Sequence, residues 1–329
     1  MRIFSGMRPT GQLHIGNYLG ALRNWVKLQK KYECVFGVVD YHGITTPFNP
    51  KTIAKDTMGL ILDYLAAGIN PKKSIIIIQS QIPEHTELAW ILGALTPLGE
   101  LSRMTQFKEK SKQHKNNVNA GLFSYPILMA ADILLYKTNL VPVGEDQVQH
   151  VELTRVLARK FNHKFGKVFP EPKVQLVKSG ARIMSLTDPS KKMSKTGDES
   201  IGLNDSPALI REKIKKAVTD SGKEIKYNLK NKPAISNLLI IYHLFSNKSI
   251  PDIEKKYQGK GPAQAGRYAQ FKKDLAEVII KGLKPFQEKR KKLEKNPQLV
   301  KRILAEGNKK AQKIAQETMK EVKEKMGLL

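Results

Sequence analysis

Two short motifs carry residue types that suit the phosphates of a nucleotide. Residues 9–17 read PTGQLHIGN, and residues 191–196 read KKMSKT. In the first motif, glycine and proline allow the backbone to approach a ligand closely in a strand-to-helix turn. His14 and Asn17 would share a face of the first helical turn, where a helix N-terminus favours anions. The alternative is a tight turn in which the histidine only caps the helix.

The second motif supplies three ammonium groups, those of Lys191, Lys192 and Lys195. Lysine binds phosphate as a point charge on a flexible stem, and a loop can close over a transition state and then reopen. By itself this motif also fits a solvated basic loop. Together, the two motifs predict a site that holds ATP from two sides and releases pyrophosphate. A P-loop is excluded because Gln12 and Leu13 stand where its Lys-Ser/Thr pair belongs.

The N-terminal region has the pattern of a parallel sheet with helical crossovers. Strands are expected at 2–7, 34–39 and 74–80, and helices at 15–30 and 53–65. This alternation predicts an α/β fold, a Rossmann-type doubly wound parallel sheet with right-handed connections. Ligands bind such sheets beyond the carboxyl ends of the strands, where residues 6–11 and 40–42 fall.

The middle of the chain is expected to be mainly helical, with one long loop. A helix is expected over residues 84–98, and a mobile loop over the polar, Lys-rich residues 106–119. Pro126 is expected to open a helix through Tyr136, because proline is favoured at the first helical position. Three further expectations are a helix opening at 144–147 and running to about Phe161, a loop over 191–202, and helices only after Pro207.

Composition and charge bound the class of protein. A length of 329 residues allows two domains, expected as a catalytic domain over 1–205 and an all-helical domain over 206–329. The net charge of +27 points to a polyanionic partner, although a lysine-rich or heat-adapted surface gives the same excess. The sequence has no signal-peptide pattern and no run of 18 apolar residues, so a cytoplasmic protein without membrane contact is expected.

The two motifs resemble the HIGH and KMSKS signatures of class I aminoacyl-tRNA synthetases. Residues 144–155, GEDQVQHVELTR, resemble the tryptophanyl-tRNA synthetase family in particular. Shorter matches to that family lie at 4–6, 43–45, 125–136 and 181–186, so the resemblance covers essentially the whole chain. It implies a Rossmann-type catalytic domain, a helical anticodon-binding domain and a homodimer. It also implies that ATP with Mg²⁺ and L-tryptophan give tryptophanyl adenylate and pyrophosphate, and that tryptophan is then transferred to the 3′ end of tRNA(Trp).

The same resemblance assigns roles to positions of this sequence. Asp132 corresponds to the aspartate that reads the indole, while Tyr125 and Gln147 correspond to contacts of the tryptophan ammonium. The remaining amino-acid contacts fall on Phe4, Gly6, His42, Met129, Val141 and Val143. The catalytic roles fall on His14, Asn17, Lys110, Lys192 and Lys195. The ATP contacts fall on Arg8, Thr10, Gly16, Asn17, Gly144, Asp146, Met184, Lys192, Met193, Ser194 and Lys195.

Some positions depart from the signatures. Asn17 stands where the signature has a second histidine, as is usual in this family, and Thr196 replaces the last serine of KMSKS. Arg8 stands where many relatives have glutamine, which puts the local nucleotide contacts in doubt. Some relatives carry a four-cysteine iron–sulfur cluster, and a chain whose one cysteine is Cys34 cannot form it.

The residues themselves support an indole pocket. Tyr125, Met129, Asp132 and Tyr136 have the spacing of one helical face, which would be apolar apart from one carboxylate. An unpaired carboxylate there is costly, and an indole N–H is a lone donor on a large apolar body. The alternative is that Asp132 caps or pairs within the structure.

No protein-bound metal is expected. His42, His85 and His150 lie on separate elements without ligand spacing; His42 is expected near the site and the other two are expected to be structural. The chemistry needs no side-chain nucleophile, because the tryptophan carboxylate attacks. Catalysis would rest on positioning and on charge stabilisation at phosphorus.

Three rival functions have different signatures. The tyrosine enzyme shares the fold, but a phenol hydroxyl both donates and accepts and so needs a second polar group. Met129, Val141 and Val143 leave that face apolar, which favours indole. A small-molecule adenylyltransferase would not need the basic helical domain. A catalytically inactive RNA-binding paralogue would not need His14, Asn17, Lys192 and Lys195.

Overall fold

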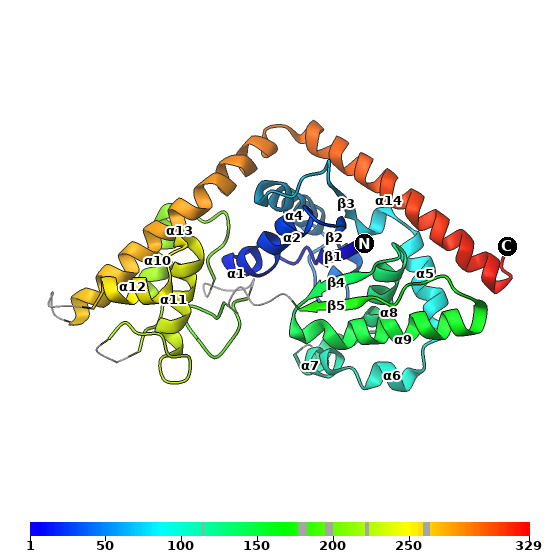
Figure 1. Ribbon diagram of the computed structural model, residues 1–329, viewed down its shortest axis with the longest axis horizontal. Helices are drawn as coiled ribbons and strands as arrows, with labels where there is room; N and C mark the ends of the chain where they lie inside the picture. The colour runs from blue at the N-terminus through cyan, green and yellow to red at the C-terminus, as the bar shows by residue number, and fades with distance from the viewer. Residues whose placement is uncertain (114, 177–182, 195–199, 221–223, 259–263) are drawn as a thin grey trace. The chain divides into compact units, whose positions relative to one another are not determined.

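The computed structural model describes the whole chain except residues 114, 177–182, 195–199, 221–223 and 259–263. In the described part, five parallel strands form one sheet in the order β3-β2-β1-β4-β5 (Figure 1). These strands are β1 (Arg2–Met7), β2 (Glu33–Val38), β3 (Ser74–Ile78), β4 (Leu140–Val143) and β5 (Lys173–Leu176). Because β1 pairs with both β2 and β4, the strand order reverses beside β1, as in a doubly wound sheet. The predicted fold class is confirmed.

Helices pack on both faces of this sheet (Figure 1). Helix α4 (Ile53–Ala67) lies against β2, where the Tyr64 hydroxyl donates to the carbonyl of Gly37 at 3.0 Å. On the other face, Phe4, Val35 and Ile77 join a buried cluster to which three neighbouring helices, among others, contribute side chains. Those helices are α5 (Glu84–Gly93), α8 (Ala120–Leu134) and α9 (Val148–Phe165). Alternate strand side chains therefore point into two separate helical layers.

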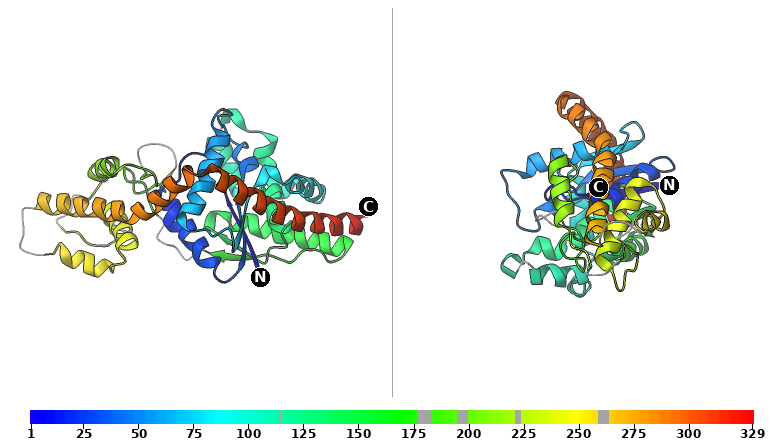
Figure 2. Two further views of the ribbon diagram at one scale, coloured as in Figure 1. Left: turned by 90° about the horizontal axis from the view of Figure 1, so that it is seen from above. Right: turned by 90° about the vertical axis from the view of Figure 1, so that its left-hand side faces the viewer.

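The last helix, α14 (Pro297–Met326), packs along the edge strand β3 and beside α5 (Figures 1 and 2). A Cβ atom at Gly307 would lie 2.1 Å from the carbonyl oxygen of Ile76, so this approach requires glycine. The next residue, Asn308, accepts a hydrogen bond from the backbone amide of Ile78 at 3.4 Å. The open edge of the sheet is thereby covered by a helix.

The chain divides into two compact units. The first unit comprises Met1–Thr10, Val26–Val177 and Asn296–Leu329, and the second comprises Gly11–Trp25 and Lys178–Lys295. Besides the elements above, the first unit contains α3 (Asp40–Gly43), α6 (Leu98–Ser102), α7 (Thr105–Gln113) and 3₁₀ turns at Gln79–Gln81, Lys115–Asn117 and Glu145–Gln147.

The second unit is helical wherever it has regular structure in its described residues. It holds α1 (Ile15–Asn17), a π-helical turn (Tyr18–Leu22), α10 (Pro207–Lys216), α11 (Pro233–Ser246), α12 (Ile250–Lys256) and α13 (Gln264–Glu294). Helix α2 (Arg23–Leu28) continues the helical run of residues 15–22. The expected helix over 15–30 and the helical C-terminal pattern are therefore confirmed.

Two expectations about helix positions were wrong. Residues 105–113 form α7 rather than a loop; none of the side chains of this helix is fully buried, so it has no continuous apolar stripe for a sequence pattern to reveal. Helix α8 begins at Ala120, not at Pro126, because the Asn119 side chain accepts a hydrogen bond from the amide of Leu122 at 2.9 Å and caps the helix. Pro126 lies inside α8.

The helix expected over 84–98 is also shorter than predicted. Helix α5 ends at Gly93, and α6 begins only at Leu98. Pro97 explains the gap, since a proline disfavours helical geometry at the residue before it.

Candidate active site

The carboxylate of Asp132 is the centre of a buried polar cluster in the first unit. Asp132 is 1% exposed; its Oδ1 accepts from Nε2 of Gln79 at 2.7 Å and lies 2.6 Å from Nδ1 of His85. Its Oδ2 lies 2.8 Å from Nε2 of His42. Burial opposes ionisation, but the interactions of the carboxylate with His85 and His42 outweigh it and lower the pKa of Asp132 to about 2. The carboxylate is therefore an ionised acceptor at neutral pH.

The sheet explains why these side chains meet. His42 lies on α3 directly after β2, and Gln79 directly follows β3, so both stand at carboxyl ends of neighbouring strands. His85 is the second residue of α5, while Asp132 comes from the last turns of α8. Asp132 therefore pairs within the protein, which is the alternative that the sequence left open. The residues that it pairs with include two at the carboxyl edge of the sheet, where parallel sheets of this kind bind ligands.

An apolar wall adjoins the cluster. The ring of Phe4 on β1 stacks on Tyr136, with ring centroids 5.6 Å apart and planes inclined by 11°. The Tyr136 hydroxyl lies 2.8 Å from Nε2 of His85. Val141 and Val143 of β4 are buried in the same core cluster. The first unit therefore places an aromatic and aliphatic surface around one carboxylate.

The expected single helical face is confirmed for three of its four residues. Tyr125, Met129 and Asp132 lie on α8, and Met129 is half-buried. Tyr136 lies just beyond the end of α8, which stops at Leu134, and it is fully buried. It reaches the cluster through His85 rather than along the helix.

Tyr125 is the centre of a second group of side chains. Its hydroxyl lies 2.8 Å from Nε2 of His150, and the Lys110 ammonium lies 4.4 Å from the centre of its ring. Burial and the nearby charge of Arg8 lower the pKa of Lys110 to about 8. The ring of His42 meets Tyr125 edge-on at 6.1 Å, so the two groups are continuous.

The turns after β1 and β4 carry the other residues expected in the first unit. A Cβ at Gly6 would lie 2.8 Å from Val39, and one at Gly144 would lie 2.8 Å from Oδ1 of Asp146. Gln147 donates to Oδ2 of Asp146 at 2.9 Å, and both follow Gly144 in an accessible 3₁₀ turn. Arg8 and Thr10, which follow β1, are half-buried. These turns belong to adjacent strands at the point where the strand order reverses.

His14 and Asn17 form a reciprocal cap at the start of α1 in the second unit. The amide of Gly16 donates to Nδ1 of His14 at 3.1 Å, and the amide of His14 donates to Oδ1 of Asn17 at 3.2 Å. A Cβ at Gly16 would lie 2.9 Å from the His14 ring, so glycine is needed there. A neutral His14 whose Nδ1 accepts carries its proton on Nε2, which makes that nitrogen a donor. The histidine therefore caps the helix, as the alternative held.

The lysine motif is part of the same unit. Lys192 forms an antiparallel bridge with Met184, and the amide of Met193 donates to the carbonyl of Ile183 at 3.1 Å. The Lys192 side chain is exposed and Met193 is buried, while Ser194 is half-buried. Lys195 lies outside the described residues.

Two contacts tie this motif to its surroundings. The Asn237 side chain on α11 donates to the carbonyl of Met184 at 3.0 Å and accepts from its amide at 2.9 Å. On the far side of the motif, Gly202 forms an antiparallel bridge with His14. The second unit therefore brings together the described parts of both motifs that the sequence singled out.

Some residues of these groups were missed in the sequence. Gln79 and His85 contact Asp132 directly, although His85 was expected to be structural, and Asn237 was not considered. The position of Gln79 at the end of a predicted parallel strand was a usable signal. His85 and Asn237 gave none, because their contacts join segments 47 and 53 residues apart.

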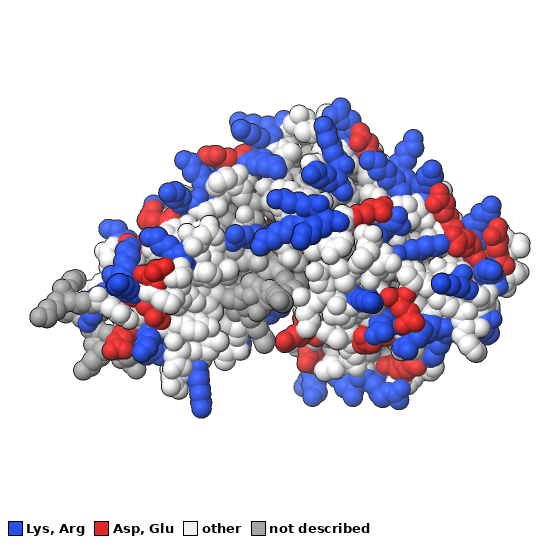
Figure 3. Space-filling model, in the orientation of Figure 1, with Lys and Arg blue, Asp and Glu red and all other residues white. Residues whose placement is uncertain are grey.

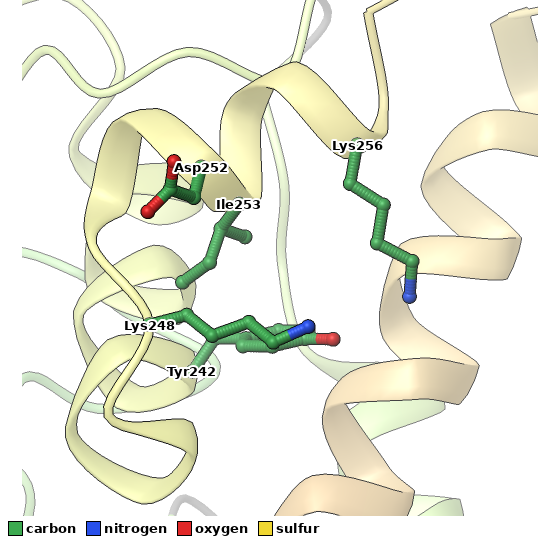
Figure 4. Close-up of a pocket in the computed structure, with 5 residues that line it drawn as sticks. All are labelled: Tyr242, Lys248, Asp252, Ile253 and Lys256. Atoms are coloured by element: carbon green, nitrogen blue, oxygen red, sulfur yellow. The ribbon is translucent and has the colours of Figure 1, made fainter.

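Two pockets lie away from these groups. One, of about 540 Å³, is lined by Leu95, Lys160, His163 and Lys164. The other, of about 360 Å³, is lined by Tyr242, Lys248, Asp252, Ile253 and Lys256 (Figure 4). The Lys256 ammonium is already paired with Asp274 at 2.5 Å. Neither pocket contains a residue expected in the active site.

The described part of the chain contains neither a candidate metal-binding group nor a candidate membrane-spanning helix. No group of three or more His, Cys, Asp or Glu side chains there is placed to hold a metal ion. No helix within those residues is both long and apolar enough to cross a membrane.

Comparisons with known proteins agree with this fold. The model of the family described as tRNA synthetases class I (W and Y) matches residues 1–284, so the chain belongs to this family. A tryptophan–tRNA ligase from Caldanaerobacter subterraneus subsp. tengcongensis is 51% identical, over 100% of this chain and 98% of the relative. A tryptophan–tRNA ligase from Helicobacter pylori is 49% identical, over 100% of this chain and 99% of the relative.

A solved structure is similar over the full length. The tryptophanyl-tRNA synthetase of Campylobacter jejuni, crystallised with ADP and tryptophan, is 36% identical with a TM-score of 0.87. The match covers 99% of this chain and 100% of that one.

Proposed function

We infer that the chain acts as a tryptophan–tRNA ligase. It activates L-tryptophan with ATP, giving tryptophanyl adenylate and pyrophosphate, and then transfers tryptophan to the 3′ end of tRNA(Trp). The family match and the full-length tryptophan–tRNA ligase relatives support this reaction. The fold alone would not, because related folds carry other activities.

The observation that carries the inference is the buried, ionised carboxylate of Asp132 within an apolar wall. An indole presents one N–H donor on a large apolar body and matches such a surface. A phenol would also need a donor for its oxygen, but Nε2 of Gln79, Nε2 of His42 and Nδ1 of His85 each face the carboxylate. The pocket therefore favours tryptophan over tyrosine.

Residue roles in the first unit follow from this assignment. We propose that Tyr125 and Gln147 bind the tryptophan ammonium, with Phe4, Gly6, His42, Met129, Val141 and Val143 completing the pocket. Lys110 offers a cation close to Tyr125, suited to phosphate oxygens. The same role, or a backbone contact to the nucleotide, is proposed for Arg8, Thr10, Gly144 and Asp146.

The second unit supplies donors for the triphosphate. In the proposed step, the tryptophan carboxylate forms a bond to the α-phosphorus, and the bond to the bridging oxygen of pyrophosphate breaks. His14 and Asn17 place donors at a helix N-terminus, and Lys192 and Lys195 receive the charge that develops on the leaving group. The remaining contacts proposed for this unit are Gly16, Met184, Met193 and Ser194. Mg²⁺, held through the ATP phosphates, would neutralise phosphate charge.

The helical C-terminal region is the proposed tRNA-binding domain, over residues 206–329, beside a catalytic domain over 1–205. Residues 201–329 hold 30 basic and 14 acidic side chains. Lys and Arg side chains are spread along α13 and α14 on the face shown in Figure 3. Binding of tRNA(Trp) should weaken steeply with salt, because the protein displaces counterions from the RNA. An affinity that is the same at 50 mM and about 200 mM salt would mean that the charge is a generic surface.

A cytoplasmic homodimer is the proposed state of the protein. Trp90 on α5 is 83% exposed and Leu98 on α6 is 74% exposed, so two large apolar side chains of the first unit are accessible to a partner. Sedimentation of the full chain should give a dimer, and Trp90→Glu should shift it toward monomer. A monomer for the unmodified chain at micromolar concentration contradicts the proposal.

The proposed reaction is tested by pyrophosphate exchange into ATP with each of the twenty amino acids. Tryptophan should be the only good substrate. A tyrosine rate within about tenfold of the tryptophan rate would contradict the assignment. The charged hydrogen bond from the indole N–H to Asp132 should by itself separate the two amino acids by at least that factor.

A further inference from the structure

We propose that His85, held by Tyr136, is a positioning residue that fixes which oxygen of Asp132 accepts the indole N–H. This inference rests on the proposed function. It deepens that function by assigning specificity to two side chains that lie behind the carboxylate rather than against the substrate. The acceptor it assigns is Oδ2.

The Asp132 carboxylate has a limited number of acceptor positions, and most of them are occupied within the protein. An ionised carboxylate offers about four lone-pair positions, two on each oxygen. In the described part of the chain, Oδ1 receives Gln79 at 2.7 Å and His85 at 2.6 Å, so both of its positions are taken. Oδ2 receives only His42, at 2.8 Å. The position left for a ligand donor is on Oδ2.

The two hydrogen-bond partners of His85 determine which of its ring nitrogens carries a proton. Nδ1 faces a carboxylate, which cannot donate, so Nδ1 carries a proton. Nε2 lies 2.8 Å from the hydroxyl of Tyr136. If Nε2 were also protonated, the hydroxyl proton of the fully buried Tyr136 would lose this acceptor, at a cost of about 1–3 kcal/mol. The consistent arrangement has Tyr136 donating to Nε2 and Nδ1–H donating to Oδ1.

The hydrogen bonds from Tyr136 to His85 and from His85 to Asp132 restrict the rotation of the Asp132 carboxylate. The terminal torsion of an aspartate is broad and roughly two-fold, so an unsupported carboxylate can turn about it. The contact at 2.6 Å anchors Oδ1, and this also fixes the position of Oδ2. Tyr136 also stacks on Phe4, so the apolar wall and the support of the carboxylate share one side chain.

The alternative is that His85, which is fully buried, only fills space in the core. The two roles differ in one respect. A positioning role affects ligands that donate an N–H, whereas a packing role affects all ligands of the same shape. Tryptophan and 3-(benzothiophen-3-yl)alanine, which has sulfur in place of the indole N–H, separate them.

The experiment compares kcat/KM in pyrophosphate exchange for these two amino acids with four variants. His85→Leu removes both ring nitrogens. His85→Asn keeps an amide donor near the position of Nδ1. Tyr136→Phe removes only the hydroxyl. His163→Asn, on the exposed end of α9, is the matched control.

The quantity of interest is the preference for tryptophan over the analogue. It should fall about 10- to 100-fold in His85→Leu, the range expected for a charged hydrogen bond, with little change in the analogue's own kcat/KM. His85→Asn should restore most of the preference, Tyr136→Phe should lower it about threefold to tenfold, and His163→Asn should leave it unchanged.

Two results overturn the inference. One is an equal loss for both amino acids in His85→Leu. The other is an unchanged preference in Tyr136→Phe, which keeps the inference testable even if His85→Leu does not fold. Failure of the proposed function would look different, because the unmodified protein would then show no tryptophan-dependent exchange.

Discussion

The hydroxyl of Tyr125 lies 2.8 Å from Nε2 of His150, and both side chains are buried in the first unit. Burial, together with the nearby charges of Lys110 and His42, lowers the pKa of His150 to about 4, and Asp146 opposes this only in part. His150 is therefore neutral at physiological pH and can accept the proton of Tyr125. The tyrosine oxygen then keeps its lone pairs for the ammonium group that we propose it binds.

This arrangement predicts a loss of stability in mild acid. An unfolded histidine has a pKa near 6.5, so between about pH 6.5 and 4 the unfolded chain binds a proton that the folded chain does not. The free energy of unfolding should therefore fall as pH falls through this window, by about 3 kcal/mol in total from His150. Urea unfolding of the unmodified chain and His150→Asn at pH 7.5 and 4.5 measures it. An equal fall in both proteins, with His163→Asn as control, contradicts the assignment.

Lys110 predicts a change of activity in alkali. Its pKa of about 8 means that the free protein loses this positive charge as pH rises through 8. If Lys110 binds a phosphate of ATP, kcat/KM for ATP should decline above that pH, because this parameter reports the free enzyme. Lys110→Arg should keep its charge and move the decline to higher pH. The same alkaline decline in both proteins would assign the effect to another group.

The lysine motif predicts a loss confined to the transition state. The Lys192 side chain is exposed in the free protein, and its segment is anchored through Met184 to Asn237. Lys192→Ala should slow adenylate formation by roughly 10²–10³-fold with little effect on the dissociation constant of ATP. Single-turnover rates with ATP binding measured alongside separate the two quantities. Lys191→Ala removes the neighbouring ammonium group, which is paired with Asp188 at 3.0 Å, and shows whether the loss is specific to Lys192.

A variant that binds ATP about a hundredfold more weakly, yet reacts at the normal rate when saturated, would make Lys192 a ground-state anchor. The proposal for Lys195 rests on the family resemblance and is subject to the same measurement.

Gly307 of α14 packs so closely against β3 that a side chain at this position is predicted to be destabilising. Gly307→Ala would place a methyl group against the Ile76 carbonyl and force α14 away from β3, so the free energy of unfolding should fall by about 3 kcal/mol. Gly99→Ala on α6 is the control, because the atom nearest to its added Cβ is 3.8 Å away. Thermal unfolding of both variants measures the difference. Equal stability would mean that α14 does not press on the strand.

Strands β1, β2 and β3 and the two motifs could be predicted because their signals are local, whereas β4 and β5 were not predicted. β1 and β3 are short apolar runs bounded by turns, and the first motif has its glycines and its capping histidine within a few residues. Helix α7 could not be predicted, since none of its side chains is fully buried and it has no clear apolar period. The start of α8 was predicted wrongly, because Pro126 suits a first helical position but lies inside this helix.

Asp132 and His42 were both expected in the site, but Gln79 and His85 were not, and no contact between these side chains was predicted. His42, Gln79 and His85 lie 90, 53 and 47 residues from it in sequence, so only the folded sheet brings them together. The same holds for Gly307, whose role depends on a strand more than 200 residues away. Long-range contacts of this kind leave no periodic pattern in the chain.

The central claim is that the carboxylate of Asp132 reads the indole N–H, and Asp132→Asn tests it most directly. The measurement is kcat/KM for tryptophan in pyrophosphate exchange, made on a variant that unfolds at the temperature of the unmodified protein. A charged hydrogen bond contributes roughly 1.5–3 kcal/mol, so the account predicts a loss of about 10- to 150-fold, with weaker rejection of amino acids that lack an indole N–H. Unchanged kinetics and unchanged selectivity in the folded variant would contradict it and leave Asp132 as a purely structural carboxylate.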